Sequence, residues 1–522
     1  MRTLMNRFVI PLGLAAVLLL VALASALGDD AGGPDRSPDA GGPTASAPAK
    51  PHVVLLIMDE LPGDTLLDRR GRVDPVRYPN LAALAADSTW FRNGHSIYDS
   101  TTKAVPLVLD GMWPRPGSSP DRRGHPRSVF DMFAPRGYRV VASEEASAVC
   151  PPRICDGART RKPAILPLLN EGRTRRFNRW VRSIEDGRPT FWMKHLLMPH
   201  GPYVHLPSGA RTRPKPRDLL PGMNTVPGFH DEFLTRHNEQ RYLLQLGYTD
   251  RLLGRLVRRL KRQGIYDGTL MVVVADHGYL WRSGVETRRR ALADTAAELA
   301  PVPYFVKRPG QRRGRVNGAL ARTLDVPSTI ADVLGVPLGY RDDGRSAFSR
   351  AARRARRITF PTREFDAVVT VPARRWKAQR RRVVRRRLLL FGSGDLAALY
   401  GGIGPNRDLI GREAGSLARA AGGGGQGTIV QGDLLANVRR ASGLVPTQIA
   451  GHVEGGGSGE LRDLAVAVNG RIEAVGRSFR LAGDAGEHFA FMVPEGSMRE
   501  GHNTVEVFEV VGGDRLRPVV RR

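Results

Sequence analysis

Cysteine is scarce in this sequence of 522 residues, which contains only Cys150 and Cys155. So small a number makes a metal site built on thiolates a poor interpretation. Both residues lie in the segment CPPRIC, and in an oxidising compartment this close spacing predicts a local disulfide. Two buried free thiols are the alternative interpretation.

Acidic residues are also few: 51 Asp and Glu stand against 80 Lys and Arg, which gives a formal net charge of +29. The densest basic runs lie at residues 353–357 and 374–387. This charge alone favours nucleic acid as a partner, but no nucleic-acid-binding motif is present, so none is expected. Anionic lipid head groups or cell-envelope polymers are the expected electrostatic partners, and a solvated arginine-rich surface is the alternative.

An apolar run without charge extends from Phe8 to Leu27 and is just long enough to span a bilayer. Arg2 and Arg7 precede it, so the rest of the chain is expected on the outer side of a membrane. We therefore predict a cell-membrane protein with a single N-terminal span and an extracytoplasmic folded part. The small-residue pattern ASA at 24–26 permits cleavage, and a secreted protein is the alternative.

Shifts in composition divide the chain into segments. After the apolar run the residues are almost all Gly, Pro, Ala, Ser and Asp, which predicts a flexible tether. A glycine run at 422–425 marks a later boundary. The predicted segments are a membrane anchor or signal segment (1–27), a flexible linker (28–50), a main α/β domain (51–350), a basic and glycine-rich connecting region (351–430) and a C-terminal β-rich domain (431–522).

We predict an α/β fold for the main domain, because apolar strand-like runs alternate with helical patterns. Three continuous apolar runs suit central parallel strands of a sheet with helices on both faces: HVVLLIM at 52–58, TLMVVVA at 269–275 and VPYFV at 302–306. Leucines at helical spacing predict a long helix over 239–262. Near the C-terminus, alternating residues and the hairpin signal Asn469-Gly470 predict a small β-sandwich.

Acidic residues follow two of the predicted strands directly. Asp59 and Glu60 come after the first run, and Asp276 and His277 come after the second. In an open α/β sheet, ligands bind at the carboxyl ends of the strands, so these side chains are expected to converge where a divalent cation binds. Taken singly, each acid is also explained as a helix cap or a turn residue.

A third segment, DSTTKAVP at 99–106, is typical of a loop that enters a helix. Hydroxyl groups at a helix start meet exposed backbone N–H groups, and such a start favours anions, including a phosphate or sulfate group. An ordinary N-cap by Ser100, Thr101 or Thr102 is the alternative.

The order of these pieces resembles the sulfatase-like family of the alkaline phosphatase superfamily over roughly residues 51–350. The shared features are a strand followed by an acid, a hydroxyl at a helix start, the segment HLLMPHGPY, and a strand followed by Asp-His-Gly. The stretch at 322–346 is similar to the family's Asp-x-x-Pro-Thr helix followed by Gly and a later Gly-x-Ser. The resemblance implies a central, mostly parallel sheet with helices on both faces.

Sulfatases proper carry Cys or Ser in a Cys-x-Pro-x-Arg motif, whose first residue is oxidised to formylglycine, with a glycine ten positions later. Counting back from Gly111 leads to Thr101, and the motif's oxidisable residue, proline and arginine are absent. The spacing Thr-x-x-x-x-Pro instead resembles the phosphoethanolamine and glycerol-phosphate transferases of the same superfamily. In that branch the nucleophile is a metal-bound threonine.

The resemblance implies one divalent metal ion, zinc, manganese or calcium. Its implied ligands are Asp59, Thr101, Asp276 and His277, with Glu60 as a further candidate. His200 is implied to bind the ester oxygens or to protonate the leaving group, and His195 to assist. Lys103 is a further candidate for substrate binding.

These observations predict a metal-dependent hydrolase or transferase that acts on phosphoesters of a lipid or a cell-envelope polymer through Thr101. Sulfate ester hydrolysis is the second interpretation, although an unmodified threonine lacks the geminal hydroxyl that expels sulfate. A non-catalytic sulfatase-like module that binds envelope polymers is the third.

Overall fold

The computed structural model describes residues 50–522 except 224–229, 286, 402, 423–424, 455–460, 485 and 522. The predicted membrane span at 1–27, and all of the predicted linker except residue 50, lie outside these residues. Among the helices that the structure does describe, none combines the length and the apolar character needed to cross a bilayer. This finding contradicts the predicted cell-membrane location with a single span, and the secreted alternative gains no support.

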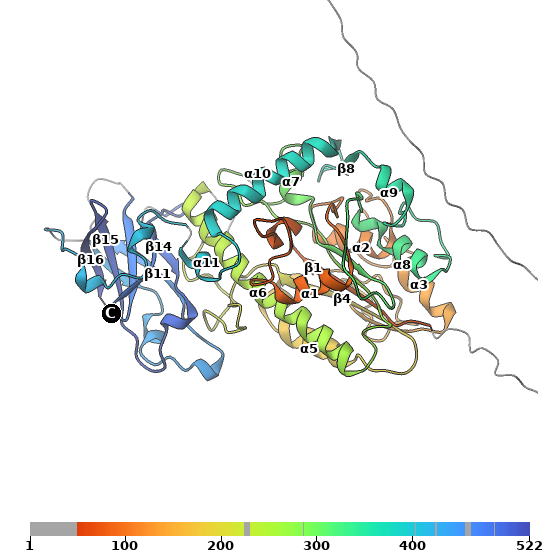
Figure 1. Cartoon of the computed structure of the whole chain (residues 1–522), viewed down its shortest axis with the longest axis horizontal. Helices are drawn as coiled ribbons and strands as arrows, with labels where there is room; N and C mark the ends of the chain where they lie inside the picture. The colour runs from red at the N-terminus through yellow and green to blue at the C-terminus, as the bar shows by residue number, and fades with distance from the viewer. Residues whose placement is uncertain are drawn as a thin grey trace, which may run out of the picture. The chain divides into compact units, whose positions relative to one another are not determined.

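A seven-stranded sheet forms the centre of the larger part, in the order β3-β4-β1-β5-β6-β2-β7 (Figure 1). Its strands are β1 (Val53–Asp59), β2 (Thr89–Phe91), β3 (Arg139–Ser143), β4 (Thr190–Pro199), β5 (Leu270–Ala275), β6 (Tyr304–Lys307) and β7 (Arg315–Asn317). Strands β3, β4, β1 and β5 run parallel to one another. The predicted mostly parallel α/β sheet is therefore confirmed.

One predicted strand has the wrong direction. The run VPYFV was expected to form a central parallel strand, but β6 pairs antiparallel with both β5 and β2. Its residues are fully buried, as their apolar character requires. A continuous apolar run indicates that a strand is buried on both faces of a sheet. It does not indicate the direction of the strand.

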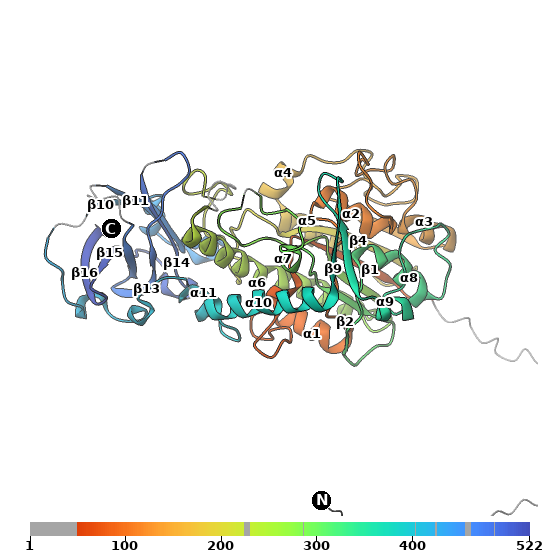
Figure 2. The same cartoon turned by 90° about the horizontal axis from the view of Figure 1, so that it is seen from above.

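Helices cover both faces of this sheet (Figures 1 and 2). The helices of this part of the chain are α1 (Pro79–Asp87), α2 (Thr101–Asp110), α3 (Val129–Phe133), α4 (Ile165–Asn170), α5 (Arg173–Arg182), α6 (Glu232–Arg262), α7 (Ala296–Leu299), α8 (Val326–Leu334) and α9 (Arg350–Arg354). Val54, Leu56 and Met58 of β1 pack into one apolar core with α1, α5 and α6, while Val53, Leu55 and Ile57 pack into the other with α2, α3 and α8. Successive side chains of a strand point to opposite faces, so β1 contributes to both cores.

The long helix α6 contains the predicted helix at 239–262 and begins earlier. Asp231 is its N-cap, and the Asp231 carboxylate accepts a hydrogen bond from the N–H of Leu234 at 2.7 Å. The predicted leucine stripe faces the sheet, because all of its members belong to the core on that side: Leu243, Leu246, Leu252, Leu256 and Leu260.

The basic stretch after residue 350 has regular structure of its own. Strands β8 (Arg357–Pro361) and β9 (Val368–Pro372) form a hairpin, followed by helices α10 (Ala373–Phe391) and α11 (Ala397–Gly401). Helix α10 contacts the short helix η1 (Gly63–Leu66), which follows β1, and it also contacts α7. The arginine-rich run thus packs against the segment that leaves the carboxyl end of the central strand.

Two antiparallel sheets form the C-terminal part, in the orders β10-β11-β14 and β13-β12-β15-β16. Their strands are β10 (Gln426–Ile429), β11 (Gln448–Glu454), β12 (Asp463–Val468), β13 (Arg471–Arg477), β14 (Glu487–Met492), β15 (Val505–Val511) and β16 (Arg515–Arg521). Asn469 and Gly470 both have positive φ and connect β12 to β13, as the hairpin signal predicted.

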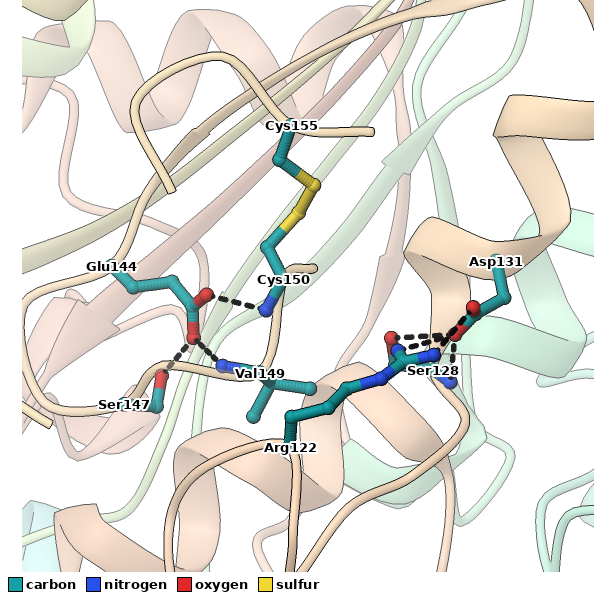
Figure 3. Close-up of a disulfide and its surroundings, with 8 residues drawn as sticks. All are labelled: Arg122, Ser128, Asp131, Glu144, Ser147, Val149, Cys150 and Cys155. Atoms are coloured by element: carbon teal, nitrogen blue, oxygen red, sulfur yellow. Dashed lines mark hydrogen bonds and ion pairs between the residues drawn. A yellow bond between two sulfur atoms is a disulfide. The ribbon is translucent and has the colours of Figure 1, made fainter. Parts of the chain in front are cut away.

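Cys150 and Cys155 are joined in a loop that follows β3 (Figure 3). The Glu144 carboxylate organises this loop by accepting hydrogen bonds from the N–H groups of Val149 and Cys150 at 2.9 and 2.7 Å and from the hydroxyl of Ser147. These bonds satisfy the two buried amides and the hydroxyl, and they hold the chain in a tight turn around the two cysteines.

Candidate active site

Two neighbouring parallel strands deliver the acidic residues to the same edge of the sheet. Met58 of β1 is in register with Ala275 of β5, so the residues that follow, Asp59 and Asp276, emerge side by side. With His277 they form a buried group in which each residue offers one ligand atom and these atoms lie within 4.8 Å of one another. The structure therefore brings together three of the predicted metal ligands.

The free atoms of this group fit a divalent cation. Oδ1 of Asp276 accepts hydrogen bonds from the N–H groups of Glu60 and His277, at 3.0 and 2.7 Å, whereas the buried Oδ2 has no hydrogen-bond partner among the described residues. Nδ1 of His277 lies 2.8 Å from the carbonyl oxygen of Gly278, and this acceptor places the ring proton on Nδ1. Nε2 of His277 is then left with a lone pair, 3.4 Å from Oδ2 of Asp276.

The electrostatics of Asp59 lead to the same conclusion. Burial raises the pKa of Asp59 well above its ordinary value, and the neighbouring carboxylates of Asp276 and Glu60 raise it further. Arg289 acts in the opposite direction without cancelling these effects. The ligand oxygens of the buried Asp59 and Asp276 carboxylates lie within 4.8 Å of each other, so the pair needs a positive charge between them. Divalent metals bind a donor set of carboxylate oxygens and an imidazole nitrogen.

Thr101 is the first residue of α2, and its side chain lies against the same group. Its Oγ1 is 3.3 Å from Oδ1 of Asp59 and 3.2 Å from Nε2 of His277. The side chain of Ser100, the N-cap residue, makes no capping hydrogen bond. Thr101 is therefore directed at the acidic group, and the alternative of a simple N-cap does not describe its contacts.

The two predicted histidines occupy different places. His195 of β4 is in register with Ile57 of β1, and its Nε2 lies 3.6 Å from Oδ2 of Asp59. Neither of its ring nitrogens has a hydrogen-bond partner in the described part of the chain. Burial lowers the pKa of His195 to about 4, so the ring is neutral at neutral pH.

His200 belongs to an outer layer of the site. Its Nδ1 lies 2.8 Å from the carbonyl oxygen of Gly201, which places the ring proton there, and its Nε2 accepts a hydrogen bond from Arg289 at 2.9 Å. Burial lowers the pKa of His200 to about 4, and the charge of Arg289 adds to this effect. His200 is thus positioned to orient a guanidinium group.

The carboxylate of Glu60 is not part of the Asp59–Asp276–His277 group. Its carboxylate forms ion pairs with Arg289, whose Nε is 2.7 Å away, and with Arg288 at 3.5 Å. Burial alone would raise the pKa of Glu60, but Arg289, His200 and Arg288 together hold it below its usual value. The carboxylate is therefore ionised and already neutralised by arginine, which does not match its predicted place beside the metal.

Lys103 also points away from the acidic group. Its ammonium donates hydrogen bonds to the carbonyl oxygens of Ser118 and Arg115, at 2.5 and 3.2 Å. These contacts fix the loop that follows α2. The structure thus assigns Lys103 a bracing contact rather than the predicted contact with substrate.

Sequence reasoning missed Arg288 and Arg289, which supply the positive charge of the site. They lie in the loop between β5 and α7. Burial lowers the pKa of Arg288 and Arg289, but the negative charge of Glu60 outweighs this effect and holds both above the ordinary arginine value. The available signal was a run of three arginines shortly after Asp-His-Gly. In a sequence with 80 basic residues, such a run does not stand out.

The structure combines a mostly parallel α/β sheet with a buried Asp-Asp-His group at its carboxyl edge beside a helix-start hydroxyl, an arrangement of the alkaline phosphatase-like superfamily. The chain belongs to the sulfatase family, whose profile matches residues 51–336, more than half of the sequence. Members of this family are hydrolases that use a divalent metal ion.

The similar proteins include both sulfatases and hydrolases of phosphorus esters. An ulvan-active sulfatase of Formosa agariphila is 25% identical over 30% of this chain and 29% of its own length, and a choline-sulfatase of Rhizobium meliloti is 22% identical over 55% of this chain and 68% of its own. Among solved structures, a phosphonate monoester hydrolase of Agrobacterium radiobacter is 16% identical, with a TM-score of 0.42 over 59% of this chain and 80% of that one. The match to the first relative thus spans less than a third of its length.

Proposed function

We propose that this protein is a phosphoester hydrolase or phosphotransferase in which Thr101 is the nucleophile. The observation that supports the proposal most directly is the position of the Thr101 hydroxyl, which lies 3.3 Å from Asp59 and 3.2 Å from His277. A divalent cation held by Asp59, Asp276 and His277 supplies a Lewis acid that lowers the pKa of a neighbouring hydroxyl group.

The reaction has two steps. In the first, Oγ1 of Thr101 attacks phosphorus: the Oγ1–P bond forms, the bond from phosphorus to the leaving oxygen breaks, and the hydroxyl proton passes to Oδ1 of Asp59. The leaving alkoxide takes a proton from water. In the second, water or an acceptor alcohol attacks the same phosphorus: the new O–P bond forms, the Oγ1–P bond breaks, and Thr101 takes back the proton held by Asp59. The proton of the attacking water or alcohol neutralises the hydroxide left by the first step. Water as acceptor gives hydrolysis, and an alcohol gives transfer.

Arg289 is the group best placed to bind the non-bridging oxygens of the ester. Glu60 and His200 hold its guanidinium from two sides, and Arg288 adds a second positive charge nearby. Because Nε and Nη2 of Arg289 are held by Glu60 and His200, the N–H groups of Nη1 are the donors left for the ester, and they are oriented before substrate binds. His195, which is neutral and close to Asp59, supports the inner side of the site.

Sulfate ester hydrolysis is the second candidate, because both curated relatives named above are sulfatases. The residue at position 101 argues for phosphorus instead. An unmodified threonine has no geminal hydroxyl to expel sulfate from a covalent intermediate, whereas water or an alcohol displaces a phosphothreonine directly. A non-catalytic module is the third candidate, and it predicts no turnover that depends on Thr101.

The test compares Thr101→Ala with Thr102→Ala, a control on the next residue of the same helix start. Aryl phosphate, aryl phosphodiester and aryl sulfate are assayed with each protein. We expect Thr101→Ala to lose turnover of a phosphorus ester by roughly a thousandfold or more and Thr102→Ala to retain it, with similar thermal melting. Chelation of the metal should abolish activity, and addition of zinc, manganese or calcium should restore it. Full activity of Thr101→Ala, or turnover confined to aryl sulfate, would refute the proposal.

A further inference from the structure

A second region of strong positive charge lies outside the candidate active site. It is a groove of about 820 Å³ between helix α10 and the two short segments 64–71 and 92–93. Seven cationic side chains line it: Arg69, Arg70 and Arg92 on one side and Lys377, Arg380, Arg381 and Arg385 on the other. None of the site residues Asp59, Thr101, Asp276 and His277 contributes to it. We call it the arginine groove.

Most of these cations have no negative partner. Among the described residues, no carboxylate forms an ion pair with Arg69, Arg70, Lys377, Arg381 or Arg385. The two acids in the groove wall are already bound, because Asp64 accepts two hydrogen bonds from Arg380, and Asp68 is held by its own turn and by Arg72. The groove thus carries a surplus of positive charge that nothing in its wall neutralises.

The cations on α10 form a regular row. Residues 377, 381 and 385 are each four apart, so they lie on one face of the helix, about 6 Å from one to the next along its axis. Figure 2 shows α10 as a straight helix along the edge of the larger part. A row of this kind, opposite Arg69, Arg70 and Arg92, matches a ligand with several negative charges along its length better than a single ion.

We propose that the arginine groove binds a linear, phosphate-bearing polymer without stacking bases. A chain enters a concave groove with cations on both sides, whereas a flat bilayer reaches only the rim. No aromatic side chain lines the groove, and base-stacking platforms are what single-stranded nucleic acids require. Leu388 and Leu389, the latter 74% exposed, offer apolar surface for the uncharged parts of such a chain.

The groove also has a direct link to the candidate site. Asp64, which lines it, belongs to helix η1, which begins four residues after Asp59. A polymer held here lies against the segment that leaves the metal-binding edge of the sheet. The choice of phosphate over sulfate rests on the proposed function, whereas the binding of a polyanion does not.

The test uses two double variants of the full chain that remove the same charge from the same helix. Arg381→Gln with Arg385→Gln alters the groove, and Arg374→Gln with Arg375→Gln alters exposed arginines of α10 outside it. Fluorescently labelled inorganic polyphosphate is titrated at 0.15 M salt, and anisotropy gives Kd. We expect the groove variant to weaken binding about tenfold and to reduce its salt dependence, because bound cations displace counter-ions. We expect the control to change Kd less than about twofold.

Equal weakening in both double variants would overturn the proposal, because it would indicate only a diffuse basic surface. Tighter, groove-dependent binding of phosphatidylglycerol vesicles or of single-stranded DNA would also overturn it. The same titration on Thr101→Ala separates the two hypotheses: unchanged polyphosphate binding is expected whether or not Thr101 is the nucleophile. Matching thermal melts of both double variants and the wild type verify that the fold is retained.

Discussion

At the scale of single residues, Glu60 combines an unusual backbone with a buried charge. Its φ of 57° lies in the left-handed region, which is uncommon for residues other than glycine. Its N–H donates to Asp276, and its carbonyl oxygen accepts from the hydroxyl of Tyr242 at 3.0 Å. These bonds maintain a strained conformation that turns the carboxylate toward Arg289. Strain retained next to the candidate active site is expected where orientation matters for function.

We therefore predict that the geometry of Arg289, and not only its charge, determines the rate. Arg289→Lys keeps the positive charge but loses the planar pair of donors, and kcat/KM should fall by about 10 to 100-fold, the value of one or two charge-assisted hydrogen bonds. Arg290→Gln, which changes the exposed neighbour, should retain wild-type kinetics. Steady-state assays on an aryl phosphate measure both. Wild-type activity of Arg289→Lys would mean that only the charge is needed.

The sequence predicts the inner residues of this site but not their surroundings. Asp59, Asp276 and His277 follow strands, and strand register forces them together whatever their rotamers. Glu60 and Lys103 were assigned to the site because they are close in sequence to its members, but the direction of a long side chain depends on partners from distant segments. For Glu60 that partner is Arg289, which is 229 residues away.

At the scale of elements, α10 braces the segments around the site. Arg380 is buried on its inner face and binds both oxygens of Asp64, with Nη2 at 2.6 Å and Nε at 2.9 Å. Arg387 donates to the carbonyl oxygens of Asp64 and Leu67. One turn earlier, the indole N–H of Trp376 donates to the carbonyl oxygen of Ala296 at 2.9 Å. The helix therefore fastens both the segment after β1 and the start of α7.

Removal of one partner from this buried ion pair should cost far more than removal of an exposed arginine. Arg380→Met should lower the free energy of unfolding by about 3 to 5 kcal/mol, because Asp64 is left as an uncompensated buried charge. The exposed neighbour Arg381→Met should change it by less than about 0.5 kcal/mol. Urea denaturation measures both.

A double variant gives the sharper result. Arg380→Met combined with Asp64→Leu should be more stable than Arg380→Met alone, because no charge then remains buried. The loss for the double variant is compared with the losses for Arg380→Met and Asp64→Leu measured separately. A double loss equal to the sum of these two would show that Arg380 and Asp64 do not interact.

Composition explains why this brace was not expected. A run of fourteen residues rich in arginine at 374–387 is usually a solvated surface, and the sequence gives no sign of which members turn inward. Burial of Arg380 and Arg387 is decided by the position of Asp64 and of two carbonyl oxygens more than 300 residues earlier. The local sequence pattern around Arg380 and Arg387 does not identify partners that are so distant in the chain.

At the scale of the whole molecule, buried histidines couple stability to pH. Burial lowers the pKa of His95 to about 3, and the charges of Arg322, Arg380 and Arg345 add to the effect. Burial also lowers the pKa of His237 well below its ordinary value. In the unfolded chain a histidine titrates near pH 6.5, so below that pH the unfolded state binds more protons than the folded state. Stability from these residues is present above pH 6.5 and is lost as the pH falls.

Each such histidine should contribute up to about 1.4 kcal/mol of lost stability per pH unit below pH 6.5. We predict that His95→Phe, which keeps an aromatic ring against Trp376 but cannot bind a proton, will lose less stability than the wild type between pH 7.5 and 5. Buried acids act in the opposite direction: burial raises the pKa of Asp250 to about 6, so its protonation offsets part of the wild-type loss.

The informative quantity is therefore the difference in the free energy of unfolding between His95→Phe and the wild type, measured by urea denaturation at each pH. His502→Gln, which replaces an exposed histidine, is the matched control and should follow the wild type. An identical pH dependence for His95→Phe and the wild type would show that His95 is not held neutral by burial.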